Sequence, residues 1–209
     1  LEIAPGEHVA LVGSTGAGKS TLAAIVAGHV EPSSGERDVR GRLTLVSQDV
    51  HVFAATVRDN ITLAAAGLDD DGVWAAMRAA RCAEWVGGLP DGLDTRVGHL
   101  GHPLTTAQGQ QLALARLAAH DPQIVVLDEA TAEAGSSGAR LLDDAAHAVI
   151  AGRSALIVAH RLSQAREADR ILVMEHGRIV EAGTHDDLVA AGGHYAELWE
   201  AWSAPTLAD

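Results

Sequence analysis

One stretch of the sequence has the residue types and spacing of a phosphate-binding loop. Residues 13–20 read Gly-Ser-Thr-Gly-Ala-Gly-Lys-Ser and fit the pattern G-x-x-x-x-G-K-[ST]. In such a loop, successive backbone N–H groups surround an anion, and the glycines let the backbone approach it closely. Lys19 is expected to neutralise phosphate oxygens, and the Ser20 hydroxyl is expected to ligate Mg²⁺. The predicted nucleotide-binding residues are Gly13, Ser14, Thr15, Gly16, Ala17, Gly18, Lys19, Ser20 and Thr21.

The surroundings of this loop favour phosphate binding over a chance match. A strand is predicted at His8 to Val12 and a helix at Thr21 to Ala27, and strand, glycine loop and helix form the context that the motif requires. Lys19 is also the only lysine of the chain, since the other 14 of the 15 basic residues are arginines. A dinucleotide-binding fold is the alternative use of a glycine loop, but the Lys-Ser pair argues against it.

Two carboxylates follow another predicted strand. Asp128 and Glu129 come directly after the apolar run Ile124 to Leu127, and ligands of open parallel sheets bind at the carboxyl ends of the strands. We expect Asp128 to hold Mg²⁺ through water and Glu129 to polarise an attacking water as general base. Taken alone, the acidic pair also fits a solvated strand end, and the phosphate loop is what favours the functional interpretation.

Polar residues end two further predicted strands. Gln48 lies just beyond Leu43 to Val46, and His160 follows Ala155 to Ala159. Parallel strands deliver their carboxyl ends to one edge of a sheet. The sequence therefore predicts that Gln48 and His160 join the phosphate loop and the two carboxylates at that edge.

The order of the predicted elements indicates an α/β fold. Strands alternate with helices, which predicts a mainly parallel sheet flanked by helices. We expect a single domain over 1–209, with a core at 1–54 and 121–209 and a helical subdomain at 55–120. Within and around that subdomain, helices are predicted at Asp69 to Trp85, Thr105 to Ala119 and Ala139 to Ile150. A hairpin turning at His176-Gly177 and two short helices are predicted to close the chain.

Composition excludes several classes of protein. The chain has 28 acidic and 15 basic residues and a formal charge of −13, which makes nucleic acid a poor partner. The single cysteine, Cys82, excludes a disulfide within the chain and is expected to be a small buried apolar residue. No apolar run approaches the length of a membrane span. Because the sequence begins with Leu1, we expect it to be a segment of a longer protein.

Taken together, the motifs resemble the nucleotide-binding domains of ATP-binding cassette (ABC) transporters, which are P-loop NTPases. The resemblance runs over almost the whole chain and includes the phosphate loop, Asp128-Glu129, Leu45 to Gln48, Ala159 to Leu162 and Gly177 to His185. The stretch Val52 to Ile61 resembles the exporter branch, whose cassettes are usually fused behind a transmembrane domain.

This resemblance implies a function and partners. In the family, ATP is sandwiched between two cassettes at the cytoplasmic face of the membrane, and hydrolysis of Mg-ATP powers transport. By resemblance, Glu129 is the general base, Gln48 reaches magnesium and the transmembrane partner, and His160 contacts the γ-phosphate. The expected partners are a transmembrane domain and a second cassette.

Departures from the family pattern lie at residues that face the second cassette. The family signature Leu-Ser-Gly-Gly-Gln reads Leu104-Thr105-Thr106-Ala107-Gln108 here. Thr106 and Ala107 put side chains where backbone should approach the γ-phosphate bound by the partner. Residues 132–135 also lack the family's aspartate. Because residues 13–20, Asp128 and Glu129 are intact, we predict an asymmetric heterodimer in which this chain contributes a degraded signature to the second site.

One other expectation follows from the resemblance. Only seven residues lie between Gly35 and Leu43, where the family has a strand pair, so the antiparallel N-terminal lobe is expected to be truncated.

Two alternative functions stay open: a regulatory module that binds ATP and hardly hydrolyses it, and a soluble cassette ATPase outside transport. Glu129 separates the first alternative from an ATPase.

Overall fold

The computed structural model describes residues 1–47, 50–128, 136–159 and 161–203. The chain divides into two compact units. Unit 1 comprises Leu1–Arg40, Val126–Asp128 and Arg153–Asp209, and unit 2 comprises Gly41–Val125 and Glu129–Gly152. The division into a core at 1–54 and 121–209 and a helical subdomain at 55–120 stays a prediction.

Six strands form one sheet. They are β1 (His8–Val12), β2 (Leu43–Val46), β3 (Ile124–Asp128), β4 (Ser154–Val158), β5 (Arg170–Glu175) and β6 (Arg178–Gly183), in the order β2-β3-β4-β1-β5-β6. Strand β1 is central and pairs in parallel with β4 and β5, whereas β5 and β6 are antiparallel. The predicted α/β fold with a mainly parallel sheet is confirmed, and β1 and β2 have the predicted bounds.

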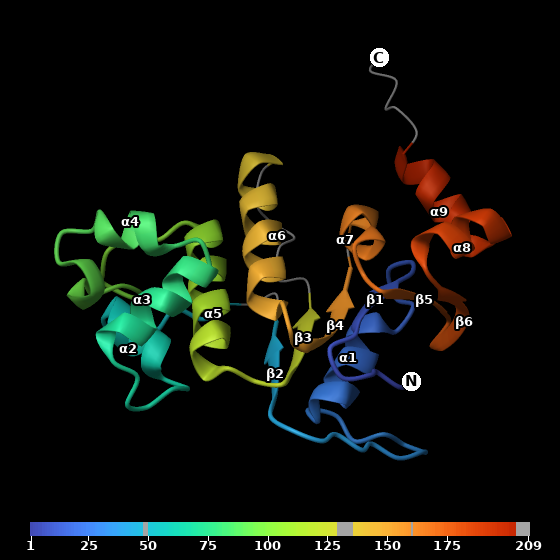
Figure 1. Cartoon of the computed structure of the whole chain (residues 1–209), viewed down its shortest axis with the longest axis horizontal. Coiled ribbons are helices and arrows are strands. Elements are labelled where there is room, and N and C mark those ends of the chain that lie inside the picture. Colours follow the sequence, from blue (N-terminus) through green and yellow to red (C-terminus); the bar gives the residue numbers. More distant parts are fainter. Residues whose placement is uncertain (48–49, 129–135, 160, 204–209) are drawn as a thin grey trace. The chain divides into compact units, whose positions relative to one another are not determined.

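Unit 1 carries the helices α1 (Lys19–Ala27), α7 (Leu162–Arg166), α8 (His185–Ala191) and α9 (His194–Ser203). Strand β4 and residues 9–12 of β1 are buried on both faces, as in a parallel sheet covered by other elements on each side. Alternate residues of β1, Ala10 and Val12, pack in one cluster with Tyr195 of α9. Helices α8 and α9 contact each other near the C-terminal end of the chain (Figure 1).

Unit 2 is mostly helical. It contains α2 (Val57–Thr62), α3 (Asp70–Ala79), α4 (Ala83–Gly87), the 3₁₀ helix η1 (Gly92–Asp94), α5 (Thr106–His120) and α6 (Ser136–Ile150). The long helix α5 contacts α2, α3 and α6 and is the centre of this unit (Figure 1). Cys82 is fully buried, as predicted, and burial raises the pKa of its thiol to about 12. In the described part of the chain, no helix combines the length and hydropathy that crossing a bilayer requires.

The predicted helical stretch from Asp69 to Trp85 is interrupted. It is two helices, because α3 ends at Ala79 and Arg81 adopts a left-handed φ of 56° before α4 begins. Asp69 caps α3, since its side chain accepts a hydrogen bond of 2.9 Å from the Gly72 N–H.

Two short helices, α2 and α7, were not predicted. Helix α2 begins at a capping box, in which the side chains of Thr56 and Asp59 each bond the backbone N–H of the other residue. Residues 29–42, by contrast, contain neither helix nor strand, as expected from the short connection between Gly35 and Leu43.

Candidate nucleotide-binding site

The predicted phosphate loop lies between β1 and α1 in unit 1. Glycines make the conformation of the loop possible. Gly16 and Gly18 have φ values of 83° and 99°, which residues with a Cβ atom rarely adopt. Gly18 is also the N-cap residue of α1, and no side chain caps this helix. The first N–H groups of a helix have no partner within it. Helix α1 therefore begins without a side-chain cap.

Lys19 lies against the loop. Its side chain is largely buried, and Nζ donates hydrogen bonds to the carbonyl oxygens of Gly13 (2.8 Å) and Ser14 (3.1 Å). Phosphate oxygens are charged and accept stronger hydrogen bonds than neutral carbonyls do. The first turn of α1 contains no acidic residue, so the positive end of the helix dipole is not neutralised there. These features favour an anion at the loop.

A second chain segment reaches the same helix. The hydroxyl of Ser20 donates a hydrogen bond of 3.2 Å to Oδ1 of Asp128, the last residue of β3. The buried residues 125–127 fix this strand, so the carboxylate is held in place next to the first turn of α1. Hydroxyl and carboxylate oxygens are ligands that Mg²⁺ accepts, and the pair fits the magnesium site expected from the sequence.

Three predicted site residues lie outside the described residues. They are Gln48, Glu129 and His160. Their flanking strands have been described: β2 ends at Val46, β3 at Asp128 and β4 at Val158. The expected roles in magnesium binding, general base catalysis and γ-phosphate contact stay predictions.

The altered signature forms the start of α5 in unit 2. Thr105 is the N-cap residue, and Thr106 and Ala107 are the first two residues of the helix. The Thr105 hydroxyl accepts a hydrogen bond of 3.2 Å from the Gln108 N–H, while Oε1 of Gln108 accepts one of 2.9 Å from the Thr105 N–H. This capping box uses the side chains of Thr105 and Gln108 within the helix itself.

Two residues that the sequence motifs do not indicate contact the phosphate loop. The Gly177 N–H donates a hydrogen bond of 2.9 Å to the Ala17 carbonyl, and Met174 packs against Gly13 and Gly18. Both residues belong to the hairpin β5–β6. No local signal in the sequence points to this contact, because it depends on β5 lying beside β1 in the sheet.

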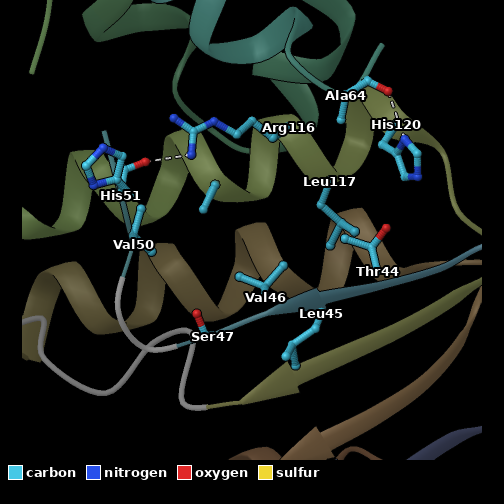
Figure 2. Close-up of a pocket in the computed structure, with 11 residues that line it drawn as sticks. Thr44, Leu45, Val46, Ser47, Val50, His51, Ala64, Arg116, Leu117 and His120 are labelled. Carbon is cyan, nitrogen blue, oxygen red and sulfur yellow. Dashed lines mark hydrogen bonds between the residues drawn. The ribbon is translucent and has the colours of Figure 1, made fainter. Parts of the chain in front are cut away.

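Unit 2 holds a separate pocket of about 290 Å³ (Figure 2). Strand β2 and helix α5 form much of its lining, and none of the phosphate-loop residues takes part. The guanidinium of Arg116 donates to the backbone oxygens of Asn60 and His51, each at 2.7 Å, and burial lowers its pKa. His120 is hydrogen-bonded through Nδ1 to the Ala64 carbonyl. The pocket is lined by Thr44, Leu45, Val46, Ser47, Val50, His51, Ala64, Ala113, Arg116, Leu117 and His120.

Comparison with known proteins gives the family. Residues 1–132 match the family described as "ABC transporter". The chain belongs to the ABC transporter family. This agrees with the resemblance found in the sequence motifs.

Relatives within the ABC transporter family are much longer than this chain. An ATP-dependent lipid A-core flippase of Chromobacterium violaceum is 42% identical over 95% of this chain and 36% of its own length. The flippase of Burkholderia pseudomallei is 43% identical over 94% of this chain and 35% of its own length. An uncharacterized ABC transporter ATP-binding protein of Bacillus subtilis is 38% identical over 96% of this chain. The chain thus spans little more than a third of these relatives.

A solved structure gives the same result. The structure of a bacterial Atm1-family ABC exporter with ATP bound matches this chain with a TM-score of 0.89 and 34% sequence identity. The match covers 100% of this chain and 39% of the exporter chain. This likeness agrees with the family match of residues 1–132.

Proposed function

We propose that this chain is the ATP-binding and hydrolysing cassette of an exporter and acts at the cytoplasmic face of a membrane. The hydrogen bond between Ser20 and Asp128 at an uncapped helix start carries the proposal. The likeness to an exporter solved with ATP supports it. The transmembrane domain is either part of the same protein or a separate subunit, and the length of the relatives supports its presence.

The phosphate loop binds the triphosphate of ATP. Backbone N–H groups of residues 13–21 surround the phosphates, and Lys19 moves from the carbonyls of Gly13 and Ser14 to phosphate oxygens. Ser20, Asp128 and Gln48 hold Mg²⁺. When bound, this ion neutralises charge on the β- and γ-phosphates.

Glu129 accepts a proton from the water that attacks the γ-phosphorus, and the bond to the β–γ bridging oxygen breaks. His160 orients the γ-phosphate during this step. Both roles come from the resemblance to the family, and the strand ends at Asp128 and Val158 are compatible with them. Closing and reopening of a cassette pair then drives transport.

We further propose that the second cassette is a different chain. The side chains of Thr106 and Ala107 at the start of α5, together with the closed capping box, support weak hydrolysis at the site to which this chain lends its signature. The site built on the phosphate loop of this chain keeps its own residues and hydrolyses ATP with the partner's signature.

The magnesium site gives the direct test. ATP affinity of the intact protein is measured with and without Mg²⁺ for the native sequence and for Asp128→Asn. We expect Asp128→Asn to lose most of the affinity gained from magnesium, because the carboxylate that holds the ion through water loses its charge. Asp38→Asn, which removes an exposed carboxylate elsewhere in unit 1, is the control. An unchanged magnesium effect in Asp128→Asn would contradict the proposed site.

A further inference from the structure

The turn of the hairpin β5–β6 touches the phosphate loop from behind at both of its ends. At the start of the loop, a Cβ on Gly13 would clash with the Met174 carbonyl oxygen. At its end, Met174 Cε lies 3.5 Å from where a Cβ of Gly18 would be, and the Gly177 N–H bonds the Ala17 carbonyl at 2.9 Å. The hairpin therefore contacts the loop at both of its ends.

The geometry of the hairpin directs Met174 and the Gly177 N–H to the phosphate loop. Glu175 pairs with Arg178 and closes a two-residue turn, and the register between β5 and β6 shifts between Val173 and Met174. Such an irregularity re-aims the residues that follow it. His176 and Gly177 have φ values of 48° and 76°, as in the tight turns that favour glycine. The direction of the Gly177 N–H depends on this left-handed conformation.

The bond from Gly177 has a consequence for the loop because of the geometry of the peptide group. A trans peptide holds its C=O and N–H on opposite sides, and the described chain contains no cis peptide. When the Ala17 carbonyl is fixed toward Gly177, the Gly18 N–H of the same peptide points away from the hairpin. That direction leads into the space where the loop is expected to surround phosphate.

We infer that Gly177 and Met174 are positioning residues for triphosphate binding, which hold the Gly18 N–H toward the ligand through the Ala17 carbonyl. The inference rests on the proposed function. Gly177 itself is exposed, and nothing lies within 4 Å of the place its Cβ would take. A side chain at position 177 would not clash. A substitution of Gly177 therefore acts through the backbone conformation of the turn.

Gly177→Val tests the inference, because a β-branched residue strongly disfavours the left-handed conformation. Gly177→Asn is the conservative variant, since asparagine tolerates it. Gly192→Val is the matched control: Gly192 has φ 65°, also has open space around it, and ends α8 in the same unit. All are made in the intact protein. The measurements are equilibrium binding of fluorescent ATP with Mg²⁺, the KM and kcat of hydrolysis, and thermal stability without nucleotide.

We expect Gly177→Val to weaken ATP binding and raise KM about fivefold to tenfold, the effect of losing one hydrogen bond, with kcat nearly unchanged. Gly177→Asn should bind almost like the native protein. Gly192→Val should lose similar thermal stability and keep its affinity.

Lys19→Ala separates failure of this inference from failure of the proposed function. If Lys19→Ala binds ATP normally, the phosphate loop itself is wrongly assigned. If Lys19→Ala loses binding while Gly177→Val retains it, only the role of the hairpin is overturned. Equal loss of affinity in Gly177→Val and Gly192→Val would overturn that role as well, because the effect would then be one of general stability.

Discussion

Two helices of this protein begin in opposite ways. Helix α1 follows a glycine loop, has Gly18 as its N-cap residue and has no side-chain cap. Helix α5 begins with the altered signature, and its Thr105 and Gln108 form a complete capping box. The first helix has no side-chain cap at its start, whereas the second uses its own side chains to satisfy terminal N–H groups.

The difference suggests separate roles for the starts of α1 and α5, one in ligand binding and the other in stability. A capped helix start is more stable by itself, by about 1 kcal/mol. For the uncapped start beside Lys19, we expect a bound anion to supply the stabilisation instead. We therefore expect substitutions in the first region to change ATP binding and hydrolysis, and substitutions in the second region to change stability and the partner's site.

The largest effect is expected at Glu129. Glu129→Gln removes the proposed general base, so turnover of the intact protein should fall about 1000-fold while ATP binding is retained. Steady-state phosphate release and equilibrium binding measure the two properties. Unchanged turnover would favour the alternative of a regulatory module that hardly hydrolyses ATP.

Removal of the only lysine should act on affinity. Lys19→Ala is expected to weaken ATP binding about 10-fold to 100-fold, the loss of charge-assisted hydrogen bonds to phosphate. Arg166→Ala, which removes a cation at the end of α7, serves as the control. Equal affinities of the Lys19→Ala and native proteins for fluorescent ATP would contradict the proposal that the start of α1 binds phosphate.

Restoring glycine in the signature should sharpen the comparison. The double change Thr106→Gly and Ala107→Gly is expected to raise turnover of the assembled protein about threefold or more. This is the effect of one added hydrogen bond between the signature backbone and the γ-phosphate bound by the partner. Ala118→Gly with Ala119→Gly, in the last turn of α5, controls for the loss of helix propensity. A rise in both double variants would contradict the role of the signature.

The smallest effect is expected at the cap itself. Thr105→Ala should lower the free energy of unfolding by about 1 kcal/mol, which corresponds to about 3 °C in Tm for a chain of this size. Thr105→Ser should keep most of the stability, because serine also caps. ATP affinity of the phosphate loop should not change in either variant. Calorimetry and ATP binding together test this separation.

Local signals were sufficient for much of the fold and for the contact between Ser20 and Asp128. Strand β1 and the glycine loop could be predicted because apolar runs bounded by glycine are local features, and α1 begins only two residues before its predicted start. The Thr56 and Asp59 capping box would have indicated α2 as well. The break at Arg81 could not be predicted from a helical pattern that continues through it.

The remaining features depend on contacts between distant segments. The support of the loop by Met174 and Gly177 requires β5 to lie beside β1. In unit 2, Asn60 is buried and its amide donates to the Phe53 and Thr56 carbonyls, while Arg116 binds its backbone oxygen. Nothing in the separate segments indicates the contact with Arg116, because Asn60 and Arg116 are 56 residues apart in the sequence.

The burial of Cys82 has a practical consequence for spectroscopy on this chain. Its thiol is fully buried and has a pKa of about 12, so almost no thiolate is present at neutral pH. Maleimide reagents should therefore leave it untouched while the chain is folded. A cysteine introduced at an exposed position would be the one that accepts a fluorophore or a spin label, and movement of α1 and α5 could be followed without first replacing the native residue.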